Sequence, residues 1–322
     1  MIPSKLSGWT LFALLAAASV SAADLRPAPL ADAVEQQAAE RVEQLLAAGT
    51  AVQSAQADGM TALHWAVYHD ELDLVRKLLA AGAAVDARTR YGVQPLSIAC
   101  QNGQARIVEL LLDSGADPNT ALPGGEAALL TASRTGNPDV VRLLLQRGAD
   151  VHAREHKGQT ALMWAAAEGH TEVVDALLSA GAEFRRPLDS GFTPLFFAVR
   201  EGRTGTALRL LQAGLDVNEP LAPLVEGKPN GAKGSTALLL AVENGHFETA
   251  RALLEAGADP NGKPAGYTAL HALTWVRKPI RGDGDPPPIG SGQRTSLDCV
   301  RDLVEHGADL NARLERGDAG RG

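Results

Sequence analysis

The chain contains 322 residues and carries a formal net charge of −8, with 38 Asp and Glu against 30 Lys and Arg. An acidic chain offers no basic stripe that could neutralise a phosphate backbone, so we expect no nucleic-acid partner. The negative charge instead favours a basic partner.

The first 22 residues have the pattern of a secretory signal peptide. Lys5 precedes a short apolar run from Trp9 to Val20, and small residues at Val20-Ser21-Ala22 suit a cleavage site. A membrane anchor is the alternative, but the run is shorter than the ~20 residues that span a bilayer. We therefore expect cleavage of residues 1–22, no membrane span afterwards, and a periplasmic or secreted protein. Residues 23–29 are expected to form a linker.

Glycines recur through the rest of the chain with a period of 33 residues. One series contains Gly49, Gly82, Gly115, Gly148, Gly181 and Gly214, followed by Gly257 after a longer gap. A second series precedes it by 23 residues and contains Gly59, Gly92, Gly125, Gly158 and Gly191, followed by Gly234 and Gly266. A fixed period of this length indicates a solenoid of stacked units. The function of a solenoid normally lies on an extended surface.

Each unit is expected to contain two short helices. In one unit, Thr160 to Ala166 begins an apolar helix, Gly169 interrupts it, and Thr171 to Leu178 has apolar residues at three- and four-residue spacing. Gly181 then supplies the φ > 0 position that ends a helix. Leucine pairs near the ends of the second helices are expected in the core between units. These pairs are Leu78-Leu79, Leu111-Leu112, Leu144-Leu145, Leu177-Leu178, Leu210-Leu211 and Leu253-Leu254.

The units resemble the ankyrin repeat, whose T-P-L-H-x-A signature several of them approach over roughly residues 27–317. The segments Thr61-Ala62-Leu63-His64-Trp65-Ala66 and Thr268-Ala269-Leu270-His271-Ala272 keep the histidine, and Gln94-Pro95-Leu96 and Thr193-Pro194-Leu195 keep the proline. The resemblance implies an all-α ankyrin repeat solenoid of helix-turn-helix units joined by β-hairpin fingers. It implies about seven full repeats after an N-terminal capping helix pair at residues 30–56. Framework histidines are expected to hydrogen-bond the backbone; they are His64, His170, His246 and His271.

The repeat array is expected to occupy residues 57–322 with two insertions. Residues 219–233 lengthen a hairpin, and residues 277–294 separate the two helices of one unit. Insertions in solenoids often lie on the binding face, although a tolerated surface loop is the alternative. Gly317 stands where the next finger glycine belongs, and no capping helix follows it. We therefore expect the array to be incomplete at its C-terminus.

We expect no catalytic residue, cofactor or metal ion. The segment from Gly257 to Lys263 resembles a phosphate-binding loop, but Pro264 replaces the required Ser or Thr. His152 and His156 lie on a hairpin, where four-residue spacing does not bring side chains together as it does on a helix. The two cysteines lie in distant units and are not expected to form a disulfide. Cys100 is expected to be buried and Cys299 to be exposed.

The resemblance implies that a partner protein binds the concave face, which hairpin tips and first helices line. Aromatic residues and Arg are typical of binding hot spots. The candidate partner-binding residues are Tyr68, His69, Tyr91, Gln101, Asn102, Arg134, Phe192, Arg200, Glu201, Tyr267 and Trp275. Trp65, Trp164 and Phe197 occupy a more buried helix position and are expected in the core.

The sequence therefore predicts an exported, monomeric module that binds another protein and has no catalysis of its own. Two alternatives stay open. The same face could serve a secreted effector that acts on a foreign target, or the repeats could be the targeting arm of an enzyme whose catalytic part lies beyond residue 322.

Overall fold

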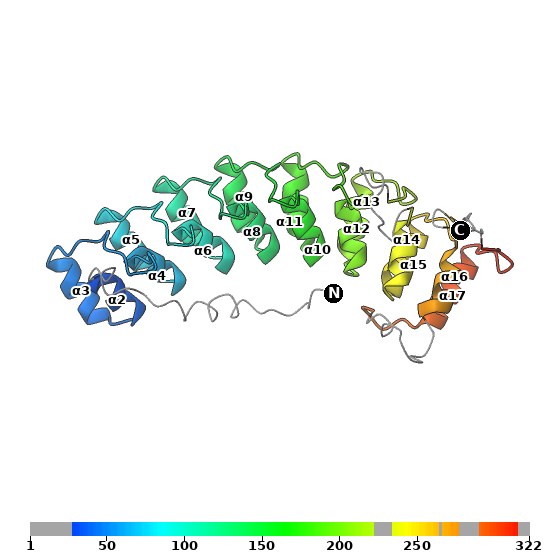
Figure 1. Ribbon diagram of the computed structural model, residues 1–322, viewed down its shortest axis with the longest axis horizontal. Helices are drawn as coiled ribbons and strands as arrows, with labels where there is room; N and C mark the ends of the chain where they lie inside the picture. The colour runs from blue at the N-terminus through cyan, green and yellow to red at the C-terminus, as the bar shows by residue number, and fades with distance from the viewer. Residues whose placement is uncertain (1–27, 222–233, 264–265, 277–289, 315–322) are drawn as a thin grey trace, which may run out of the picture.

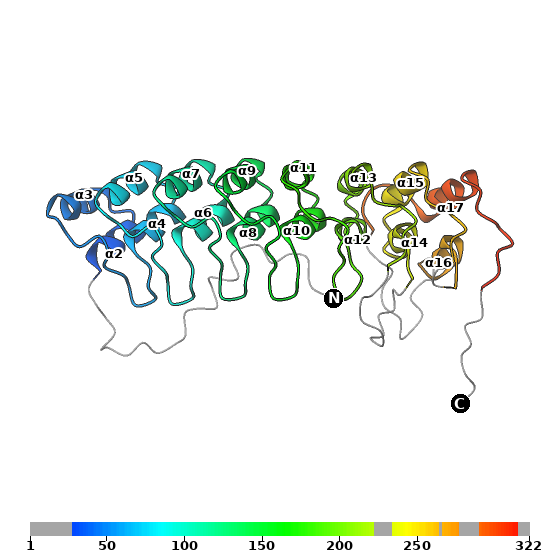
Figure 2. The same cartoon turned by 90° about the horizontal axis from the view of Figure 1, so that it is seen from above.

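The computed structural model describes residues 28–221, 234–263, 266–276 and 290–314. Antiparallel helix pairs follow one another in a single curved row (Figure 1). The first helices form a layer between the second helices and the loops that project to the other side (Figure 2). The all-α solenoid expected from the sequence is confirmed. The expected signal peptide lies outside the described residues, as do residues 222–233 and 277–289 of the two insertions.

The first helices of the pairs are α2 (Pro29–Glu35), α4 (Ala62–Tyr68), α6 (Pro95–Asn102), α8 (Ala128–Thr135), α10 (Ala161–Glu168), α12 (Pro194–Arg200), α14 (Ala237–Glu243) and α16 (Ala269–Val276). The second helices are α3 (Ala39–Ala47), α5 (Leu72–Ala80), α7 (Ala105–Asp113), α9 (Pro138–Gln146), α11 (Thr171–Ser179), α13 (Thr204–Gln212), α15 (Phe247–Glu255) and α17 (Ser296–Glu305). The pair α2 and α3 stands where the capping pair was expected.

Local sequence signals explain where these helices begin and end. Thr61 caps α4 by accepting a hydrogen bond from the backbone N–H of His64, while His64 Nδ1 accepts one from the N–H of Thr61. After α9 the chain turns at Gly148, whose φ of 88° favours glycine. Three of the loops between pairs close as isolated antiparallel bridges, Ala55 with Thr61, Ala121 with Ala127 and Arg154 with Thr160, and the described residues contain no longer strand.

The core runs continuously between the two helix layers. The first leucine of each Leu-Leu pair is buried, whereas the second is partly exposed in most pairs. Cys100 is buried as expected, but the expectation of an exposed Cys299 is wrong, because α17 packs this side chain inward against α15 and α16. Burial disfavours the thiolate and raises the pKa of both thiols to about 12.

Side chains at the turn between the two helices tie neighbouring units together. Each of five turn residues donates a hydrogen bond to a main-chain carbonyl at the end of the preceding first helix. The pairs are Gln104 with Val67, Asn137 with Gly103, His170 with Arg134, Arg203 with Ala167, and His246 with Arg200, at 2.8–3.0 Å. The framework role expected for the histidines is confirmed here, and also at His64, whose Nε2 lies 3.2 Å from the carbonyl oxygen of Val93.

We expect His64 to make the fold less stable at mildly acidic pH. Burial lowers the pKa of His64 below 6.5, although hydrogen bonds to Val93 and Ala87 oppose the shift. Protonation would also cost Nδ1 its role as acceptor for the N–H of Thr61. As pH falls through the unfolded-state pKa, the unfolded chain takes up a proton that the folded chain refuses, so stability is lost.

His64→Met, which copies the buried Met163 of a later unit, should remove this part of the pH dependence. The check is the urea midpoint of both proteins between pH 8 and about pH 5. Parallel loss of stability in the two proteins would contradict the prediction.

Candidate partner-binding surface

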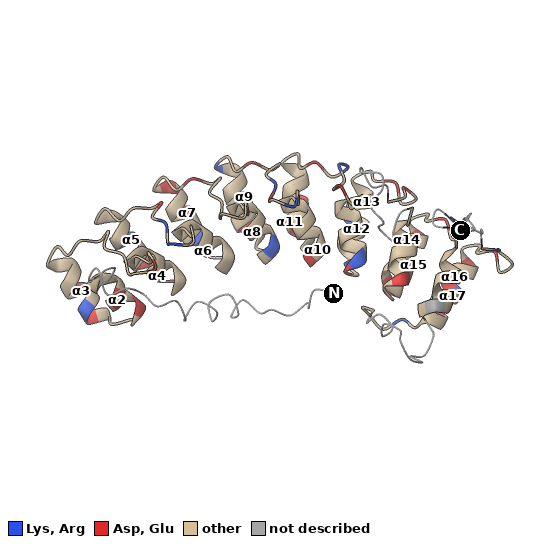
Figure 3. Cartoon of the chain, viewed as in Figure 1, with Lys and Arg blue, Asp and Glu red and all other residues tan. Residues whose placement is uncertain are grey.

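The C-terminal ends of the first helices lie along the inner side of the arch and carry charges of both signs (Figure 3). Arg134 lies in the last turn of α8 and Arg200 ends α12, whereas Glu168 ends α10 and Glu243 ends α14. We call this strip, from the end of α4 to the end of α14, the concave surface. Its charges alternate, which suits a partner with its own mixed pattern.

Arg200 is held against two aromatic rings. Its guanidinium carbon lies 5.3 Å from the ring centroid of Phe192 and 5.1 Å from that of Phe197. The two rings meet edge to face at 5.3 Å, and the Nε of Arg200 donates to Glu201 Oε1 at 2.9 Å. Phe197 is buried as expected, whereas Phe192 is half-buried. The structure thus brings three candidate residues, Phe192, Arg200 and Glu201, into one cluster.

Arg134 has a similar environment two units earlier. Its guanidinium carbon lies 5.6 Å from the ring centroid of Trp164, and its Nη2 lies 3.0 Å from Glu126 Oε1. The expectation of a core position for Trp164 is wrong in part, because the ring is only half-buried and supports the arginine. Stacking on an aromatic ring and pairing with a carboxylate restrict the arginine to few rotamers.

A third cluster lies at the end of α4. The ring of His69 stacks on Trp65 at 5.9 Å, and Tyr68 meets both rings edge to face at 5.7 and 5.3 Å. The indole N–H of Trp65 donates a hydrogen bond to Gln56 Oε1 at 2.7 Å. The side chain of Trp65 is half-buried and is therefore not part of the closed core, contrary to the expectation. Tyr68 is 41% exposed, so this cluster is partly open to solvent.

The remaining candidates are more scattered. The hydroxyl of Tyr267 donates to Glu243 Oε1 at 2.5 Å, and burial raises the pKa of Glu243 while this bond opposes the shift. Tyr91 is 46% exposed on a projecting loop, and Gln101 and Asn102 are exposed at the end of α6; the structure brings none of these three into a cluster. Trp275 lies in α16, and its side chain is outside the described part.

Sequence reasoning missed the partial exposure of Trp65 and Trp164. The two residues are separated by three repeat periods, and Phe197 follows one period later. An aromatic residue that recurs at one position of the unit was therefore the signal available. The position is buried at Phe197 but only half-buried at Trp65 and Trp164.

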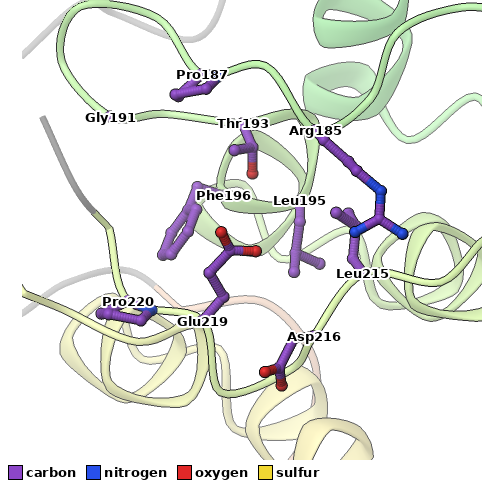
Figure 4. A pocket seen from close by; sticks show the side chains of 10 residues that line it. All are labelled: Arg185, Pro187, Gly191, Thr193, Leu195, Phe196, Leu215, Asp216, Glu219 and Pro220. Atoms are coloured by element: carbon purple, nitrogen blue, oxygen red, sulfur yellow. The ribbon is translucent and has the colours of Figure 1, made fainter. Parts of the chain in front are cut away.

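The projecting loops hold a recess too small for a substrate. Its volume is about 50 Å³, and Figure 4 shows the carboxylate of Glu219 between Phe196 and Leu195. Ligand sites usually measure about 300–1,000 Å³. Across the described ranges, no three His, Cys, Asp or Glu side chains gather as a metal site would require. None of the helices described combines the length and apolar character needed to cross a membrane.

Comparison with known families agrees with this architecture. The model for ankyrin repeats (3 copies) matches residues 30–121, 129–220 and 221–279. Comparison with curated proteins gives no match. Ankyrin repeats are generally protein–protein interaction modules and are typically not catalytic. With most of its length matched and its helix pairs stacked in one row, the chain belongs to the ankyrin repeat family.

Proposed function

We propose that the protein is an exported interaction module that binds a partner protein through the concave surface, without catalysis of its own. The observation that carries this proposal is the placement of Arg200 and Arg134 against aromatic rings at the inner ends of α12 and α8. Export rests on the signal-peptide pattern of residues 1–22, which suits the periplasm or the extracellular space.

The energetics of binding favour this use of the two arginines. A flexible arginine loses rotamer freedom on binding, which costs about 0.5–1.5 kcal/mol per side chain. Arg200 already packs on Phe192 and Phe197, yet 41% of its side chain remains exposed. An arginine that is ordered before contact and still accessible resembles the Arg and aromatic hot spots of known interfaces.

The test is crosslinking capture from the native cell envelope, with the mature chain as bait. The variant Phe192→Ala/Arg200→Ala removes one cluster, and we expect it to reduce capture of the same partner at least about tenfold. The matched control is Phe184→Ala/Arg185→Ala, because Arg185 also stacks on a phenylalanine, at 5.1 Å, but lines the recess in the projecting loops and not the strip of first-helix ends.

Capture that is lost only with the concave variant supports the proposal, provided both variants keep the circular dichroism spectrum of the native chain. Equal capture by all three proteins would contradict it and would move the binding site to another surface. Fractionation of the producing cells distinguishes a periplasmic protein from a secreted effector.

A further inference from the structure

A groove opens between the second helices α3 and α5 at the N-terminal end of the row. Its volume is about 700 Å³, which falls within the range of ligand-sized sites. Val34, Val42 and Leu74 are among its apolar lining residues, and Asp70, Glu71 and Asp73 are among its acidic ones. We call this feature the N-terminal groove. It lies mainly between second helices, and its turn residues Asp70 and Glu71 follow the end of α4 directly, so it adjoins the first end of the concave surface and is several units away from Phe192 and Arg200.

The groove exists because the first junction of the array is packed less closely than the later ones. Leu74 is partly exposed, whereas the residues at the same position of the next units, Ile107 and Val140, are buried. Glu71 also occupies the turn position at which Gln104 and Asn137 donate to the preceding unit. A carboxylate accepts hydrogen bonds but does not donate them, so this tie cannot form at the first junction.

The charge of the groove selects a basic occupant. Glu43, Asp70, Glu71 and Asp73 line it together with only two cations, Lys77 and Arg106. Lys77 is already paired with Glu43, at 2.5 Å. The adjoining segments, residues 28–38 and 57–69, add three further acidic residues and no Lys or Arg.

We propose that the N-terminal groove docks a basic, amphipathic segment of a partner protein. Lysine or arginine side chains would pair with the carboxylates of Asp70, Glu71 and Asp73 and would compete with Lys77 for Glu43. An apolar side chain would cover Leu72 and Leu74, which are partly exposed. An acidic segment is repelled by this rim. A wholly apolar segment is disfavoured because it would cover the carboxylates without offering them a partner.

Fluorescence anisotropy with a labelled peptide of alternating lysine and leucine tests the proposal on the mature chain. The groove variant is Glu43→Gln/Asp73→Asn. Its matched control is Glu109→Gln/Glu172→Gln, because Glu109 lies two repeat periods after Glu43 and Glu172 lies three after Asp73. We expect the groove variant to bind the peptide about tenfold more weakly than the native chain, and the control to bind it within about twofold.

A second variant, Ala39→Trp, obstructs the groove without changing its charge, since Ala39 is an exposed lining residue. It should also weaken binding while thermal unfolding stays close to that of the native chain. Equal weakening in the groove variant and its control, or equal binding of a lysine–glycine or glutamate–leucine peptide, would overturn the proposal. The concave variant Phe192→Ala/Arg200→Ala should bind the peptide as the native chain does. The proposal for the groove and the proposal for the concave surface can therefore be refuted separately.

Discussion

Replacement of Leu144 by alanine is expected to lower the free energy of unfolding by about 3 kcal/mol, because it leaves a cavity in the middle of the array. Leu144 is fully buried in α9, which packs against α7, α8 and α11. Since each unit of a solenoid contacts only its neighbours, a cavity here weakens the interfaces on both sides. The measurement is the urea unfolding curve followed by circular dichroism.

Leu145→Ala is the matched control, because it removes the same atoms one position further along the helix. Leu145 is only partly buried, so less apolar surface is lost from the core and the loss of stability should be clearly smaller. A loss at Leu145 equal to that at Leu144 would show that the helix faces inferred for α9 are wrong.

The fold could be predicted because its signals are local and repeated. Thr61 and Thr160 cap first helices, and Gly148 and Gly181 take positive φ where second helices end, as the glycine spacing indicated. Each unit needs a positive φ at the same position, so one glycine series shows where each unit ends. The Leu-Leu pairs predicted the core for the same reason, although only the first leucine of each pair is always buried.

The candidate site was less predictable because it depends on side-chain rotamers, some of which are set by residues about one repeat period away. Arg134 meets Trp164, and its main-chain carbonyl accepts a hydrogen bond from His170. Which rotamer an arginine adopts across such a junction depends on the ring and carboxylate that face it. The resemblance to the ankyrin repeat placed Arg200, Phe192 and Tyr91 among the variable positions of the concave face. It could not show that Arg200 would lie on two rings while Tyr91 would stand apart.

The N-terminal groove could not be predicted from the sequence for a different reason. Glu71 is unremarkable as an acidic residue at the start of a helix. Its effect on packing becomes clear only from the structure, in which Gln104 and Asn137 donate hydrogen bonds to the preceding unit from the same position of the repeat. The sequence shows that a residue differs from those at the same position of other units. The effect of that difference on packing depends on what the other residues contact.

Breaking the buried ion pair between Arg294 and Asp302 is expected to destabilise the end of the array. One guanidinium nitrogen of Arg294 donates to both carboxylate oxygens of Asp302, at 2.6 and 2.5 Å. The side chain of Asp302 is 6% exposed and that of Arg294 is 24% exposed. Asp302→Ala leaves the arginine without its hydrogen-bonded carboxylate in a largely dry site, which should cost about 3 kcal/mol.

The exposed pair of Arg147 with Asp113, in an earlier part of the array, provides the control, since Asp113→Ala should change stability little. The double variant Arg294→Met/Asp302→Leu separates two explanations of the loss. If the single variant is unstable because it leaves a charged side chain without its ion-pair partner, replacing both partners with apolar side chains should restore most of the stability. If the pair is needed to fix the loop end at residue 294 onto α17, the double variant should remain as unstable as Asp302→Ala. We expect restoration, because Cys299 and Leu303 already supply a buried apolar surface on the same helix.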